Sequence, residues 1–112
     1  MSITEINMSA NLKICAKRLL KFVDLKKSDA KKFLKAANSR LIQALSEIAF
    51  NIREGVVKVS NRVKNSQIVK GLSLKTVPLK TKCRLLCTVS APLVIQALIA
   101  SVVAVLRSLT DG

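Results

Sequence analysis

The longest uncharged run of the sequence lies near its C-terminal end, in residues 85–106, LLCTVSAPLVIQALIASVVAVL. Arg84 and Arg107 bound this run, and twelve of its residues are Leu, Ile or Val. As a helix it is apolar nearly all round, because its polar residues Gln96 and Ser101 do not share a narrow stripe. Such a helix has to be buried, either in protein or in lipid.

Ser90 and Pro92 are typical of the first turn of a helix, so we expect a helix over about residues 91–108. It would be about 27 Å long, close to the ~30 Å thickness of bilayer hydrocarbon. The amphipathic stripes elsewhere in the chain are too narrow to cover it on every side. We therefore expect membrane or oligomer contacts from one set of apolar side chains: Leu93, Ile95, Leu98, Ile99, Val102, Val103 and Leu106.

Residues 29–54 carry the clearest helical pattern of the chain. Apolar residues recur there at spacings of three or four, namely Leu34, Ala37, Leu41, Leu45, Ile48 and Ile52. Ser28 is a suitable N-cap and Gly55 a suitable stop, so one helix is predicted over 29–54. A looser pattern predicts a first helix over 3–22.

Weaker signals complete an all-α prediction. Ser60 is expected to cap a short helix over 61–70 that ends at Gly71, and Pro78 interrupts the sequence that follows. The expected small helical protein has two or three amphipathic helices in a basic region (1–71), a basic connector (72–84) and a hydrophobic, membrane-inserting tail (85–112).

The charge of the chain is strongly positive and unevenly distributed. Twenty Lys and Arg oppose six acids, giving a formal net charge of +14. Residues 1–54 hold eleven basic and five acidic residues, whereas residues 55–110 hold nine basic residues and no acid. We expect the second half to contact a polyanion such as nucleic acid or an anionic membrane. The predicted phosphate contacts are Lys58, Arg62, Lys64, Lys70, Lys75, Lys80, Lys82 and Arg84.

Several functional classes are disfavoured. The chain has no His, no glycine-rich phosphate loop and only scattered acids, so we expect no enzyme and no cofactor. Cys83 and Cys87 are too few to close a zinc site, and no metal is expected. Three Phe and no Trp or Tyr argue against stacking on single-stranded nucleic acid. The N-terminus lacks the apolar core of a secretory signal, so no export is expected.

Two segments carry a resemblance to a known family. They are LIQALSEIAFNIREGVVKVS (41–60) and TVPLKTKCRLL (76–86), followed by the apolar tail. The chain resembles a small basic protein of adenovirus-like Polinton/Maverick and adintovirus elements, similar in layout to the adenovirus core-protein precursor protein X, the mu precursor. The matching positions are Leu41, Leu45, Ser46, Glu47, Ile48, Ala49, Asn51 and Gly55, then Leu79 to Lys82 and Leu85–Leu86.

The resemblance implies a minor virion or core protein that binds DNA without sequence specificity. It implies a virion, host nucleus or cytoplasm as location and a homo-oligomeric or capsid-associated state, with membrane association through the tail. Thr88-Val89-Ser90-Ala91 replaces the usual glycine pair, and Thr81 and Cys83 thin the basic tract. Two alternatives stay open: a tail-anchored membrane protein with a cytosolic basic body, and a homo-oligomeric helical bundle.

Overall fold

Helix α3 (Ser39–Arg53) lies at the centre of the molecule and contacts helices from both ends of the chain. The computed structural model describes residues 10–111 and the side chains of residues 12–110. The apolar stripe expected for this region accounts for the position of α3, because Leu41, Leu45, Ile48 and Ile52 are fully or almost fully buried.

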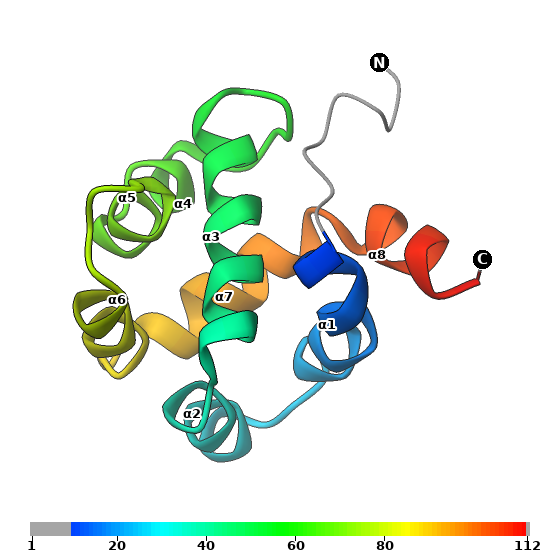
Figure 1. The fold of residues 1–112 in the computed structure, drawn as a ribbon, viewed down its shortest axis with the longest axis horizontal. Helices are drawn as coiled ribbons and strands as arrows, with labels where there is room; N and C mark the ends of the chain where they lie inside the picture. The colour runs from blue at the N-terminus through cyan, green and yellow to red at the C-terminus, as the bar shows by residue number, and fades with distance from the viewer. Residues whose placement is uncertain (1–9, 112) are drawn as a thin grey trace.

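Seven other helices surround α3 in the described part of the chain. They are α1 (Ala10–Phe22), α2 (Lys27–Lys35), α4 (Asn61–Lys64), α5 (Gln67–Ser73), α6 (Leu79–Leu86), α7 (Ala91–Ala100) and α8 (Val103–Asp111). In Figure 1, α4, α5 and α6 lie on one side of α3, and α1 and α8 lie on the other. Helix α7 crosses behind α3, and it contacts helices on both sides. The described residues contain no strand, which confirms the all-α class.

The single helix predicted over 29–54 is wrong, because the chain breaks at residues 36–38 between α2 and α3. Asn38 causes the restart: its side-chain oxygen accepts a hydrogen bond from the Leu41 backbone N–H at 2.9 Å. Asn is among the strongest N-cap residues, so this signal was present in the sequence but hidden inside a continuous apolar stripe. The break turns α2 away from α3 and gives it a separate surface.

Other boundaries follow local chemistry. Gly55 ends α3 with a φ of +80°, as expected for a C-terminal glycine. Ser60 caps α4 and Ser66 caps α5, so the short helix expected over 61–70 is two helices. Gly71 does not end this helix but lies within α5, where a Cβ would collide with the Leu85 Cδ1 atom of α6. The glycine therefore permits close approach of α6.

Two further expectations change. The connector expected over 72–84 is largely helical, because α6 begins directly after Pro78. The first helix expected over 3–22 is described from Ala10 onward, and residues 3–9 lie outside the described part.

The apolar C-terminal segment is folded into the core of the chain itself. It is not one helix, because the backbone breaks at Ser101–Val102 between α7 and α8. Five of the predicted membrane or oligomer residues are buried against the rest of the protein: Ile95, Leu98, Ile99, Val102 and Leu106. Val103 is half-buried, and Leu93 is 75 % exposed. We expected that the chain could not cover this segment, and that expectation is wrong for most of it. The exception is the side of α7 that carries Leu93.

Gln96 explains why one side of α7 faces the protein. Its side-chain Nε2 donates to the Phe22 backbone oxygen at 3.2 Å and to the Leu25 backbone oxygen at 2.9 Å. Phe22 is the last residue of α1 and Leu25 follows it in the turn, and the Phe22 oxygen also accepts from the Leu25 backbone N–H at 3.1 Å. The polar residue in the apolar run thus joins α7 to α1.

Within residues 10–111, none of the helices has both the length and the apolar character to cross a bilayer. Helices α6 and α7 pass that test only as a pair, and they meet at a bend of 100°.

Candidate nucleic-acid interface

The fold leaves nearly all of the positive charge on the surface. Eighteen of the twenty Lys and Arg side chains are exposed, Lys64 is half-buried, and Lys82 is buried. A charge of this density attracts phosphate from a distance, and its binding releases the counterions condensed on the nucleic acid.

The exposed cations form helical columns, in which successive residues are four apart and lie on one face. Helix α1 carries Lys13, Lys17 and Lys21, α2 carries Lys27, Lys31 and Lys35, and α6 carries Lys80 and Arg84. In α1 and α6 the column lies opposite the buried side chains, such as Leu19 and Leu86, whereas in α2 it borders the buried Ala30 and Leu34 and its three lysines are exposed. We call these eight residues the basic rim.

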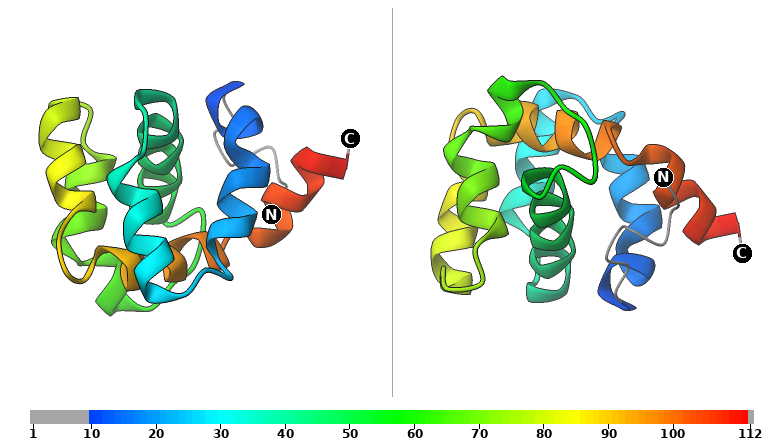
Figure 2. Two further views of the ribbon diagram at one scale, coloured as in Figure 1. Left: turned by 90° about the horizontal axis from the view of Figure 1, so that it is seen from below. Right: turned by 90° about the horizontal axis from the view of Figure 1, so that it is seen from above.

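The three helices of the basic rim are neighbours. Helix α2 contacts α6 on one side. On the other side the Phe22 ring of α1 lies 5.0 Å from the Phe33 ring of α2, measured between centroids. The Arg18 guanidinium carbon lies 6.0 Å from the centroid of the same Phe33 ring. Figure 1 shows α6, α2 and α1 in this order along the lower edge, and Figure 2 (left) shows them side by side from below.

Two acids accompany the basic rim. Asp24 lies between α1 and α2, and Asp29 lies in the first turn of α2. Negative charge at that end stabilises a helix through its dipole, which gives Asp29 a structural role. Arg18, Lys26 and Lys32 are also exposed on these helices, so cations remain in large excess.

The structure places seven of the eight sequence-predicted phosphate contacts in two groups on the surface, and it buries the eighth, Lys82. Lys80 and Arg84 belong to the basic rim. Lys58, Arg62, Lys64, Lys70 and Lys75 lie on α4, α5 and their flanking loops, on the far side of α6 from α2 (Figure 1). This second group has no column comparable to that of α2, because its members come from a loop, one helical turn, a short helix and a second loop.

Lys82 is the clear correction among the predicted contacts. Its side chain is 8 % exposed, and its Nζ donates to the Ser46 Oγ of α3 at 3.1 Å. Residues two apart on a helix point to nearly opposite sides, so Lys80 faces solvent while Lys82 faces α3. The two lysines differ only in how α6 packs against α3, which composition and charge do not show.

The lysine columns of α1 and α2 are the surface that sequence reasoning missed. Their spacing of four residues was visible, but the absence of acids in residues 55–110 drew the prediction to the second half. Charge composition alone does not show which residues share a face. That information comes from the break at residues 36–38, which exposes α2 on its own.

No known protein family, curated protein or solved structure matches this chain. Its function therefore has to be inferred from the chemistry of its surfaces and its cavity.

Replacing Lys82 by Met should stabilise the folded protein at pH 7 by about 1–4 kcal/mol, the range found when buried charges give way to apolar groups. Burial lowers the pKa of Lys82, so the folded state holds this proton less tightly than the unfolded chain does. The resulting penalty is complete below the folded-state pKa and disappears as the pH rises through the unfolded-state pKa. The gain from Lys82→Met should therefore shrink toward alkaline pH.

Urea unfolding of the two proteins at pH 7 and in the alkaline range measures this difference. Lys80→Met is the matched control, because the same change on the exposed side of α6 should alter stability by no more than about 0.5 kcal/mol. A Lys82→Met protein less stable than wild type at pH 7 would show that the bond to Ser46 outweighs the cost of burying the charge.

Proposed function

We propose that this protein is a non-enzymatic nucleic-acid-binding protein that neutralises phosphates without sequence preference through the basic rim. The observation that carries the proposal is that three neighbouring helices, α1, α2 and α6, each carry a column of exposed cations. Lysines on flexible stems suit this task, because each ammonium is a point charge that needs no fixed geometry.

The position of α3 supports binding without sequence preference. Helices α2 and α3 are joined by a short turn, the connectivity of a helix-turn-helix. In that motif the second helix enters the major groove and reads bases. Here α3 packs against α1, α5, α6 and α7, and the strip that it leaves exposed, from Arg40 through Gln43 and Phe50 to Arg53, carries cations only at its two ends. The exposed cations are phosphate contacts rather than base contacts.

The resemblance to a small basic protein of Polinton/Maverick and adintovirus elements favours the same function. A minor core protein has to offset the charge of packaged DNA, and a net charge of +14 suits that role. The proposed setting is a virion, or the host nucleus or cytoplasm during assembly, with the protein associated with the capsid or with further copies of itself.

Salt dependence tests the proposal. If the eight cations of the basic rim each neutralise a phosphate, log K for a DNA duplex should fall against log salt with a slope of about −7. Changing Lys27, Lys31 and Lys35 to Ala should reduce this slope by about 3, because three contacts are lost. The three substitutions lie on the exposed face of α2, and Ala favours helix, so the fold should be retained. Fluorescence anisotropy over a range of salt concentrations gives both slopes.

A second triple variant serves as the control with an equal charge change. Changing Lys58, Arg62 and Lys70 to Ala removes three exposed cations outside the basic rim and should leave the slope nearly unchanged. The reverse pattern would move the interface to α4 and α5. An affinity that does not depend on salt, or that strongly prefers one DNA sequence, would refute the proposed function.

A second candidate function is contact with an anionic membrane, and the corner between α6 and α7 favours it. Val89 and Leu93 are 83 % and 75 % exposed, more than the other large apolar side chains exposed in the described part. Arg84 is exposed on α6 nearby in the chain. Apolar side chains next to basic residues suit shallow insertion among anionic headgroups, where each cation contributes about 1 kcal/mol.

Flotation with anionic vesicles tests this contact. Leu93→Ser should lower the vesicle-bound fraction severalfold, because it removes the most protruding apolar side chain of α7. Ile14→Ser on α1 is the control, since Ile14 is 56 % exposed but lies away from this corner. Equal flotation of Leu93→Ser and wild type would exclude α7 as the membrane contact.

A further inference from the structure

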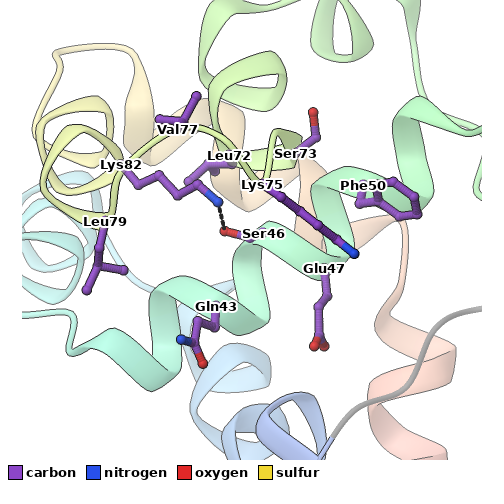
Figure 3. Close-up of a pocket in the computed structure, with 10 residues that line it drawn as sticks. All are labelled: Gln43, Ser46, Glu47, Phe50, Leu72, Ser73, Lys75, Val77, Leu79 and Lys82. Atoms are coloured by element: carbon purple, nitrogen blue, oxygen red, sulfur yellow. Dashed lines mark hydrogen bonds between the residues drawn. The ribbon is translucent and has the colours of Figure 1, made fainter.

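A cavity of about 390 Å³ lies between α3, α5 and α6, apart from the basic rim and from the α6–α7 corner. Its lining is mixed: Phe50 lies on one side and Leu72, Val77 and Leu79 on the others, and polar or charged side chains make up the rest (Figure 3). Its volume falls within the range of cavities that bind small molecules, about 300–1,000 Å³. The cavity is therefore large enough to be a binding site.

Lys82 is the unusual group in this cavity. Lysine is almost never buried unless it has an opposite charge beside it. The hydrogen bond recorded for the Lys82 Nζ is to the neutral Ser46 Oγ, whose own hydrogen is donated to the Ile42 backbone oxygen at 2.9 Å. An ammonium has three N–H donors, so this bond uses one of them. Burial is the cause of the lowered Lys82 pKa, with no charge partner contributing to it.

The surrounding charges do not supply the missing anion. Glu47 also lines the cavity, but Figure 3 shows its carboxylate pointing away from the Lys82 ammonium. Lys75 extends along the cavity from the other side and adds a second cation. The cavity lining thus carries two lysines against one acid, beside its apolar residues.

Two apolar side chains at the cavity are only partly covered. Phe50 is 37 % exposed and Leu79 is 42 % exposed, although both are large enough to favour burial. A ligand with an apolar chain would cover both of them. At the ~30 Å³ that a water molecule occupies, the cavity has room for about a dozen non-hydrogen atoms.

We propose that this cavity binds a small amphiphile with a single carboxylate, whose oxygens accept hydrogen bonds from Lys82 while its apolar chain packs on Phe50 and Leu79. A carboxylate supplies both the opposite charge and the acceptors that the buried ammonium needs. The same chemistry has two sources of suitable size, a medium-chain fatty acid and an N-acylated apolar amino acid. This site goes beyond phosphate neutralisation and does not depend on it.

Calorimetric titration of the full chain with decanoate, N-acetylleucine and decanol tests the proposal. At least one of the two carboxylates should bind at least tenfold more tightly than decanol, which has a similar chain but no charge. Tighter binding of decanoate than of N-acetylleucine would identify a fatty acid as the ligand class, and the reverse order an acylated amino acid. Two carboxylates that bind no better than decanol would overturn the proposal.

Variants separate this site from general attraction to a basic protein. Lys82→Met should abolish the preference for carboxylate over alcohol, whereas Lys80→Met removes the same charge from the exposed face of α6 and should retain the preference. Leu79→Glu provides a second test that does not alter the buried lysine, because it places a carboxylate at a partly exposed wall position. It should weaken carboxylate binding at least tenfold. A preference that survives in both Lys82→Met and Leu79→Glu would show that the ligand lies elsewhere.

Discussion

The burial of the apolar C-terminal segment is the constraint on which the rest of the structure depends. Residues 91–106 contain the most hydrophobic part of the chain, and a small protein has few surfaces with which to cover it. The solution is to break the segment at Ser101–Val102 and to lay α7 across the other helices. Gln96 then joins α7 to the end of α1, where two backbone oxygens accept its hydrogen bonds. Apolar side chains from both ends of the sequence fill the core, so nearly all of the Lys and Arg side chains lie on the surface.

The sequence predicted the class of fold and several helix ends but not the path of the chain. Gly55 and Ser60 act as expected, since their roles depend on neighbours within a few residues. Asn38 was missed because the apolar spacing on either side of it predicts one continuous helix, whereas its N-cap role predicts the start of a new helix. The prediction that α7 needed lipid or another copy failed for a geometrical reason. It assumed a straight helix that had to be covered on all sides, whereas the real helix is short and leaves Leu93 exposed.

Lys80 and Lys82 show which part of the candidate site can be predicted from the sequence and which part depends on tertiary packing. Both were predicted to contact phosphates, and in composition the two residues are equivalent. The rotation of α6 separates them, placing Lys80 in solvent and Lys82 against Ser46. A buried ammonium with a neutral partner reduces stability, which is why we propose a binding role for Lys82 at the cavity between α3, α5 and α6. The columns on α1 and α2 depend in the same way on tertiary packing.

Hydrogen–deuterium exchange of the dilute protein tests most directly whether the chain covers its own apolar segment. If the chain covers this segment itself, the backbone amides of residues 95–99 in α7 should be protected as strongly as those of residues 45–49 in α3. Vesicles or a higher protein concentration should leave this protection unchanged. Global unfolding would then be the route by which both helices exchange. Rapid exchange in α7 beside a protected α3 would show that the chain does not cover its own apolar segment. Protection of α7 that appears only with lipid or at high protein concentration would show the same.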